Sequence, residues 1–147
     1  MPKKDLPSSG NNDYETPPYV FDEWNRWFSF TMDVCASADN YKCITYYTKE
    51  DNSLVQNWHD RNWMNPPYGR GMVLPFVKKA TEEANKGKIV VGLIPVATST
   101  KWWQEYVMKA NHIYYYDHRI HYLLNKIPQT NTAFDSCIAI WGLNPTA

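Results

Sequence analysis

Four consecutive residues, Asn65-Pro66-Pro67-Tyr68, restrict the fold of this chain more than any other stretch of its sequence. Both prolines lack a backbone N–H and have a fixed φ, so neither a helix nor a paired strand can continue through them. The residue before each proline is also pushed towards extended geometry. We therefore expect a stiff turn that presents the Asn65 side-chain oxygen and the Pro66 main-chain oxygen as hydrogen-bond acceptors.

This pair of acceptors suits a planar amino group, because both amino hydrogens can be held while the nitrogen lone pair faces an electrophile. Tyr68 offers a ring on which a base carrying that amine can stack. The alternative is a structural turn that closes a strand, with Tyr68 as a core residue. The tetrapeptide alone does not separate adenine from other exocyclic amines or from a glutamine amide.

Length and composition indicate one folded domain. The chain has 147 residues, of which 44% are hydrophobic and 16% aromatic, which argues against a disordered protein. We expect residues 1–12, which are polar, to form a flexible N-terminal segment, and residues 13–147 to form a single domain. No apolar run approaches the ~20 residues needed to cross a bilayer, so no membrane association is expected.

Cysteine usage and charge give weaker indications. The three cysteines lack a C-x-x-C spacing, and we interpret them as free thiols in a reducing cytoplasm. The formal net charge is zero, but residues 1–59 carry −4 and residues 60–147 carry +4. This asymmetry is compatible with one face that meets phosphate, and equally with scattered solvated charge.

Apolar periodicity predicts helices that alternate with strands. Helices are expected from a Thr16 cap with Pro17 as first residue, over residues 75–86 before Gly87, and after a cap at Thr98 or Ser99. Strands are expected at residues 30–36, 43–48, 89–94, 112–124 and 136–141. Such alternation predicts an α/β sheet with helices on both faces and the last two strands as a hairpin at one edge.

Acidic residues follow or end two of the predicted strands. Asp33 lies within an apolar strand, where an acid is costly unless something binds it. It is a candidate partner for a ligand amine or, equally, for a structural hydrogen bond to a loop. Glu50 and Asp51 follow the next strand, where acids often grip ribose hydroxyls, and solvated loop charge is the alternative. Residues 37–40 contain no glycine, which argues against a dinucleotide or triphosphate site.

Two other groups of reactive side chains are not expected to be sites. His118 and His121 lie three residues apart in a predicted strand, so their side chains point to opposite faces and no metal site is expected. Cys35 and Cys43 lack an obvious histidine and acid to activate a thiol.

Several motifs in order resemble those of the small phage-type DNA adenine-N6 methyltransferases, the phage Dam family, from about Asp13 to Trp141. The motifs are Asp13-Tyr14-x-Thr16-Pro17, Phe30-x-x-Asp33-x-Cys35-Ala36-Ser37, Glu50-Asp51-x-Ser53-Leu54-x-x-x-Trp58, Trp63-x-Asn65-Pro66-Pro67-Tyr68, Leu93-Ile94-Pro95, Thr98-x-Thr100-Lys101-Trp102-Trp103 and Arg119-Ile120.

The resemblance implies an S-adenosylmethionine-dependent enzyme on a shortened Rossmann-like class I methyltransferase sheet, acting in the cytoplasm of a bacterial host. Asn65 to Tyr68 would hold a flipped-out adenine of double-stranded DNA, without a metal. The residues that would bind the cofactor are Tyr14, Thr16, Pro17, Asp33, Cys35, Ala36, Asp51 and Asn65. Arg70, Lys101 and Arg119 are candidates for phosphate contact because of their charge and flanking position.

Two other functions remain open for this sequence. One is a methyltransferase of glutamine in a protein, since a side-chain amide fits the same two acceptors. The other is a DNA-binding module that keeps the fold without catalytic activity.

Overall fold

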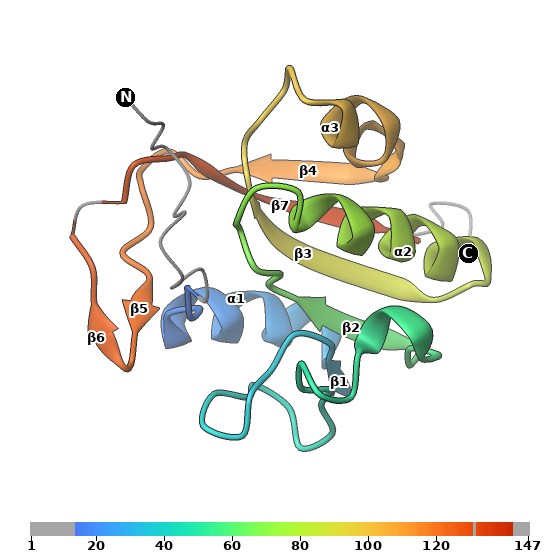
Figure 1. Cartoon of the computed structure of the whole chain (residues 1–147), viewed down its shortest axis with the longest axis horizontal. Coiled ribbons are helices and arrows are strands. Elements are labelled where there is room, and N and C mark those ends of the chain that lie inside the picture. Colours follow the sequence, from blue (N-terminus) through green and yellow to red (C-terminus); the bar gives the residue numbers. More distant parts are fainter. Residues whose placement is uncertain (1–13, 131, 143–147) are drawn as a thin grey trace.

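A five-stranded sheet in the order β1-β2-β3-β7-β4 lies at the centre of the computed structural model, which describes residues 14–130 and 132–142 (Figure 1). β1, β2 and β3 are parallel, whereas β7 is antiparallel to both β3 and β4. β4 therefore runs in the same direction as the first three strands. The strand bounds are Met32–Asp33 (β1), Arg61–Met64 (β2), Ile89–Pro95 (β3), His112–Tyr115 (β4) and Ser136–Trp141 (β7).

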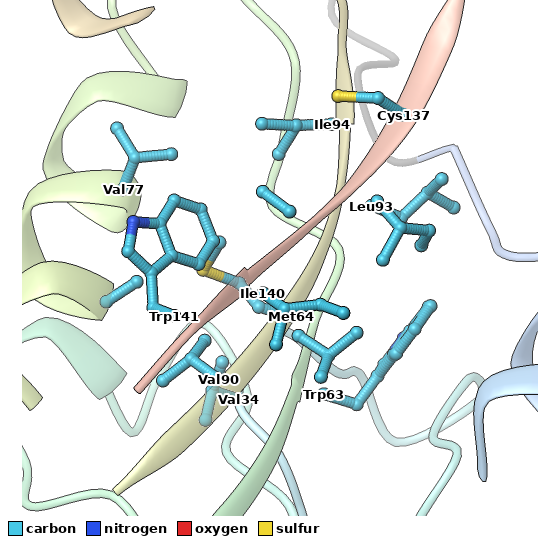
Figure 2. Close-up of a cluster of buried hydrophobic side chains, with 14 of the residues drawn as sticks. Val34, Trp63, Met64, Val77, Val90, Leu93, Ile94, Cys137, Ile140 and Trp141 are labelled. Atoms are coloured by element: carbon cyan, nitrogen blue, oxygen red, sulfur yellow. The ribbon is translucent and has the colours of Figure 1, made fainter. Parts of the chain in front are cut away.

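Helices cover both faces of this sheet. On one face α1 brings the Phe21 ring against Trp63, with centroids 5.4 Å apart, and Trp24 against Tyr114 on β4. On the other face α2 places Val77 beside Trp141, with Trp63 across the sheet (Figure 2). The α/β sheet with helices on both faces that was predicted from the sequence is confirmed. The helices are α1 (Pro18–Phe28), α2 (Val73–Asn85) and α3 (Lys101–Glu105), with 3-10 turns η1 (Ser53–Val55) and η2 (Val107–Lys109).

The elements with long apolar patterns were predicted correctly. β3 and β7 match the predicted strands, and both are buried almost along their whole length, as expected for strands covered on both faces. α2 begins two residues before the predicted start and ends at Asn85. Gly87 follows with φ 94°, a left-handed conformation that favours glycine and stops the helix.

Both predicted helix caps are displaced. Pro17 has extended geometry and stands at the N-cap of α1, so Pro18 is the first helical residue and the predicted Thr16 cap is wrong. The cap of α3 is Thr100, whose hydroxyl accepts the Trp103 N–H at 3.2 Å, and not Thr98 or Ser99. In each case the helix starts one or two residues later than predicted.

The predicted strand at 30–36 is reduced to the two residues of β1, because side chains capture the flanking backbone groups. The Asn25 side chain accepts the Phe30 N–H at 2.8 Å, and the Asp33 carboxylate accepts the Cys35 N–H at 3.1 Å. The predicted strand at 43–48 is wrong as well, since it contributes only an isolated bridge between Asp33 and Tyr46.

The predicted strand at 112–124 divides into two elements. β4 ends at Tyr115, and a separate ribbon is formed by β5 (Leu123–Leu124) and β6 (Ile127–Pro128), seen apart from the main sheet in Figure 1. β4 and β7 do pair antiparallel, but residues 116–135 join them and β7 lies inside the sheet. The last two strands of the main sheet thus pair at one edge as predicted, but a long connection that contains the β5–β6 ribbon joins them.

Candidate active site

The predicted site residues gather at the carboxyl edge of the sheet. β1 to β4 end at this edge because they share one direction. Asp33 is the last residue of β1 and pairs in register with Trp63 of β2, two residues before Asn65. In open α/β sheets, ligands bind outside the carboxyl ends of the strands, so the position of the proline corner fits a ligand site.

The orientation of the Asn65 amide is fixed by two short hydrogen bonds. Its Nδ2 donates to the Tyr14 main-chain oxygen at 2.6 Å, and its Oδ1 accepts from the Tyr68 hydroxyl at 2.6 Å. Because Nδ2 is paired with a carbonyl oxygen, the other end of the amide must be the oxygen. An amide oxygen has two lone pairs, so Oδ1 keeps one acceptor position beyond its bond to Tyr68.

Tyr68 is completely buried in this structure. Its hydroxyl lies 2.6 Å from Asn65 Oδ1, 2.7 Å from the Leu93 carbonyl oxygen and 3.4 Å from the Tyr122 hydroxyl. A phenol has one proton, so it can donate to only one of the two carbonyl-type acceptors at a time. Burial raises the pKa of Tyr68 well above its ordinary value, which keeps this proton on the phenol.

Four aromatic rings form a cluster at the corner, and every pair among them is in contact. The ring centroids of the six pairs lie between 5.4 and 6.1 Å apart, and the rings belong to Tyr14, Tyr68, Tyr122 and Phe134. The Ser136 hydroxyl lies 2.7 Å from that of Tyr122. Sequence reasoning missed Tyr122, Phe134 and Ser136, because no local pattern shows that residues 116–135 return to the corner.

Asp33 is 3% exposed and its carboxylate is held by backbone N–H groups. One oxygen accepts the Lys42 N–H at 2.9 Å, and the other accepts the Cys35 N–H at 3.1 Å. Burial raises the pKa of Asp33 to about 6, although these N–H groups and the charge of Lys42 lower it. Of the two roles open for Asp33, the structure shows the loop hydrogen bonds; the bond to a ligand amine stays a prediction.

The segment before α1 lies against the same corner. Tyr14 is half-buried and Thr16 and Pro17 are buried, while Glu15 pairs with Leu123 of the β5–β6 ribbon through two backbone hydrogen bonds. Within the described residues, no hydrogen bond involves the Thr16 hydroxyl, although Thr16 is only 2% exposed. A buried hydroxyl that lacks a protein partner fits contact with a polar group of a ligand.

The other predicted cofactor residues lie in the loops that follow β1. Cys35 and Ala36 are half-buried, and the Ala36 N–H donates to the Tyr47 carbonyl oxygen at 2.9 Å. Asp51 is exposed and accepts the Thr48 N–H at 2.8 Å, so one of its oxygens closes a local turn. Their contact with a cofactor stays a prediction.

The three basic residues predicted to contact phosphate are all exposed and follow the carboxyl ends of strands. Arg70 follows the proline corner, Lys101 begins α3 after β3, and Arg119 follows β4. Arg119 Nε lies 3.3 Å from Asp135 Oδ1, so its charge is partly compensated. The predicted contacts thus lie on the edge that carries Asn65, and they stay predictions.

Among residues 14–130 and 132–142, no group of three or more His, Cys, Asp and Glu side chains is arranged to hold a metal ion. His118 instead places Nδ1 2.8 Å from Asp117 Oδ1. In the same part of the chain, every helix falls short of the length and apolarity that crossing a membrane requires.

Comparisons with known proteins find a family and individual relatives whose sequences are similar to this chain. A model of the family described as DNA N-6-adenine-methyltransferase (Dam) matches residues 3–141. A DNA N-6-adenine-methyltransferase of Haemophilus phage HP1 is 37% identical over 119 residues, which cover 78% of this chain and 68% of the relative. A protein with the same name from Escherichia phage T1 is 33% identical over 103 residues, 61% of this chain and only 42% of that relative.

Proposed function

The chain belongs to the DNA N-6-adenine-methyltransferase (Dam) family, and from this premise we propose that it transfers a methyl group from S-adenosylmethionine to the exocyclic amine of an adenine in DNA. The family predicted from the sequence motifs is confirmed. The observation that carries the proposal is the Asn65 amide, which is locked by Tyr14 with its oxygen available at the carboxyl edge of the sheet.

The chemical role of the corner follows from the weakness of the nucleophile. The lone pair of the adenine amine is conjugated with its ring, so the nitrogen becomes nucleophilic only as it changes towards sp3 geometry. Asn65 Oδ1 and the Pro66 carbonyl oxygen accept the two amine hydrogens and favour that geometry, an interaction that is strongest in the transition state. S-adenosylmethionine, when bound, supplies a methyl group already activated by its sulfonium.

The cofactor would be held by the two segments that meet Asn65. Thr16 and Pro17 come from the segment before α1, and their support is the buried Thr16 hydroxyl without a protein partner in the described residues. Asp33, Cys35 and Ala36 come from the end of β1, and Asp51 lies farther along that connection. A carboxylate has about four lone-pair positions, so Asp33 can accept a further hydrogen bond in addition to its two backbone N–H groups.

The DNA substrate has to present its base outside the duplex. An amine inside a base pair cannot reach Asn65, so the adenine must be flipped out, and Tyr68 would stack on it. Arg70, Lys101 and Arg119 would contact the phosphates on either side, which positions the duplex without reading its sequence.

Methyl transfer to defined acceptors tests the function. The purified chain is incubated with tritiated S-adenosylmethionine and either duplex DNA or a protein mixture, and the labelled DNA is hydrolysed to nucleosides. We expect the label in N6-methyldeoxyadenosine. Label in protein glutamine would support the amide methyltransferase, and DNA binding without any transfer would support the inactive module. Either of these two results would contradict the proposal.

A further inference from the structure

In this structure no face of the Tyr68 ring is open to a base. The side chain is 0% exposed, and three rings surround it. Tyr122 and Phe134 meet it edge-on, at interplanar angles of 88° and 85°. Tyr14 is different, because its ring is tilted by only 32° from the Tyr68 plane at a centroid distance of 6.1 Å. Tyr14 is thus the ring that lies nearest to a stacked arrangement on Tyr68.

Tyr14 is also the member of the ring cluster whose side chain is the least tightly held. It is half-buried, whereas Tyr122 is 0% and Phe134 9% exposed. The Tyr122 hydroxyl is further held by Ser136 at 2.7 Å. Within the described residues, no hydrogen bond engages the Tyr14 hydroxyl. Displacement of the Tyr14 ring would therefore break ring contacts only, while displacement of Tyr122 would also disrupt a buried hydrogen bond.

The main chain of Tyr14 is held by hydrogen bonds, whereas its ring is held in the described residues by packing against other rings. The Tyr14 carbonyl oxygen accepts from Asn65 Nδ2 at 2.6 Å, and the next residue, Glu15, pairs with Leu123 at 2.7 and 3.0 Å. Rotation about the Cα–Cβ bond of Tyr14 moves the ring without moving this carbonyl. The Asn65 amide would therefore keep its orientation while the space over Tyr68 is vacated.

We propose that the Tyr14 ring occupies the position of the target base on Tyr68 and that a flipped-out adenine enters by displacing it. Tyr14 is then a residue of the base site and not of the cofactor site, which was the role implied by the resemblance of the sequence motifs. The inference rests on the proposed function. Its consequence is that the Tyr68 ring stays shielded from water until an aromatic base exchanges for the Tyr14 ring.

Base-dependent affinity tests this assignment. The probes are a duplex that the wild-type chain methylates and the same duplex with an abasic site in place of the target adenine. The ratio of the two dissociation constants measures how much the flipped base adds to binding. In the wild type, part of the binding free energy that the flipped base contributes is offset by the free energy needed to displace the Tyr14 ring. We expect Tyr14→Ala to raise the preference for the adenine duplex about tenfold, the lower range for one base stacked on an aromatic ring.

Matched variants separate this effect from others. Tyr14→Phe keeps the ring and should give the wild-type ratio of dissociation constants. Tyr19→Ala removes an exposed ring five residues away on α1 and should also leave this ratio unchanged. S-adenosylmethionine affinity, measured by calorimetry, should change less than threefold in Tyr14→Ala. Should Tyr14→Ala not fold, Tyr14→Leu removes the flat ring while keeping apolar bulk, and the same ratio should rise.

An unchanged ratio in an active chain would overturn the placement of Tyr14 and leave the proposed function standing. Loss of cofactor affinity with an unchanged ratio would return Tyr14 to the cofactor site. A wild-type chain that methylates no DNA would reject the proposed function, and the base-site assignment would fall with it.

Discussion

The two edges of the central sheet each carry a buried acid, and the groups that surround the two carboxylates differ in charge. At the amino edge, where α2 ends and β3 begins, the Glu83 side chain is 0% exposed and lies within 2.9 to 3.1 Å of three lysine ammonium groups. Its carboxylate also accepts the Trp58 N–H at 3.2 Å. The lysines are Lys79, Lys86 and Lys88.

At the carboxyl edge, Asp33 is nearly as buried, but the hydrogen bonds that its carboxylate accepts from the described residues come from two neutral backbone N–H groups. Burial acts to raise the pKa of both acids. At Glu83 the lysine hydrogen bonds outweigh it and lower the pKa to about 2, whereas at Asp33 burial prevails and the pKa is raised to about 6. Lysine cations thus keep Glu83 charged at the amino edge. At the carboxyl edge, Asp33 and Asn65 have oxygens that can accept further hydrogen bonds.

This difference assigns separate tasks to the two edges. The ion cluster ties α2, β3 and the approach to β2 together and leaves no oxygen of Glu83 without a partner. The carboxyl edge holds Asn65 and Tyr68 in neutral hydrogen bonds that can be rearranged. We infer that the amino edge maintains the fold and the carboxyl edge performs the chemistry, and each of the following predictions tests that division.

The largest expected effect on stability comes from Glu83→Gln. Removal of the buried charge leaves three lysines around a neutral amide, and loss of one partner of a buried ion pair costs about 3–5 kcal/mol. We expect a loss of this size in the free energy of unfolding, measured in urea. The methyl-transfer rate per folded molecule should be unchanged. The control is Glu82→Gln, at the exposed neighbouring position; equal effects of the two variants would contradict the account.

Asp33→Asn should produce a smaller effect whose size depends on pH. The folded-state pKa of about 6 lies above the ordinary value of 3.8, so the protonated acid contributes stability that is fully present below pH 3.8 and is lost as the pH rises through 6. The wild type should therefore lose up to about 3 kcal/mol of unfolding free energy between pH 4 and 7 relative to Asp33→Asn. If the free energies of unfolding of the two proteins changed in parallel with pH, the folded-state pKa of Asp33 would not be raised and the account would be contradicted.

The smallest effects are expected for the basic residues of the carboxyl edge. Arg70→Ala and Lys101→Ala should each weaken DNA binding severalfold and reduce the slope of log affinity against log salt by about 0.9, the value for one lost phosphate contact. Arg119→Ala should change the slope less because Arg119 is paired with Asp135. Lys109→Ala, at the end of η2 near the amino edge, is the control; a slope change there equal to that of Lys101→Ala would remove the distinction between the edges.

The parts of this molecule that the sequence predicts are those with a local cause. β3 and β7 are continuous apolar runs, and α2 has a periodic apolar face. In these segments the tertiary contacts favour the same secondary structure as the local sequence does. The proline corner was predictable for the same reason, because proline acts on its own backbone. Asp33 was recognised as an acid in an apolar setting, but its two loop hydrogen bonds could only be stated as one of two alternatives.

The parts that the sequence did not predict depend on contacts between distant residues. The bond from Asn65 to Tyr14 spans 51 positions, and the pairing of Glu15 with Leu123 is longer still. Nothing in the alternating pattern of residues 112–124 shows that the strand stops at Tyr115 and that Tyr122 turns back into the ring cluster. The corner was thus foreseen, while the residues that enclose it were not.

The most direct test of the central claim is single-turnover methyl transfer by Asn65→Ala, with S-adenosylmethionine and substrate DNA both saturating. If the Asn65 oxygen holds the amine in the transition state, the rate should fall by about 10³-fold, the upper range for loss of one transition-state hydrogen bond. Cofactor affinity should fall much less than the rate, and the rate is expressed per folded molecule because the substitution removes two short hydrogen bonds. A rate within about tenfold of the wild type, or a parallel loss of cofactor binding, would contradict the assignment of the chemistry to this corner.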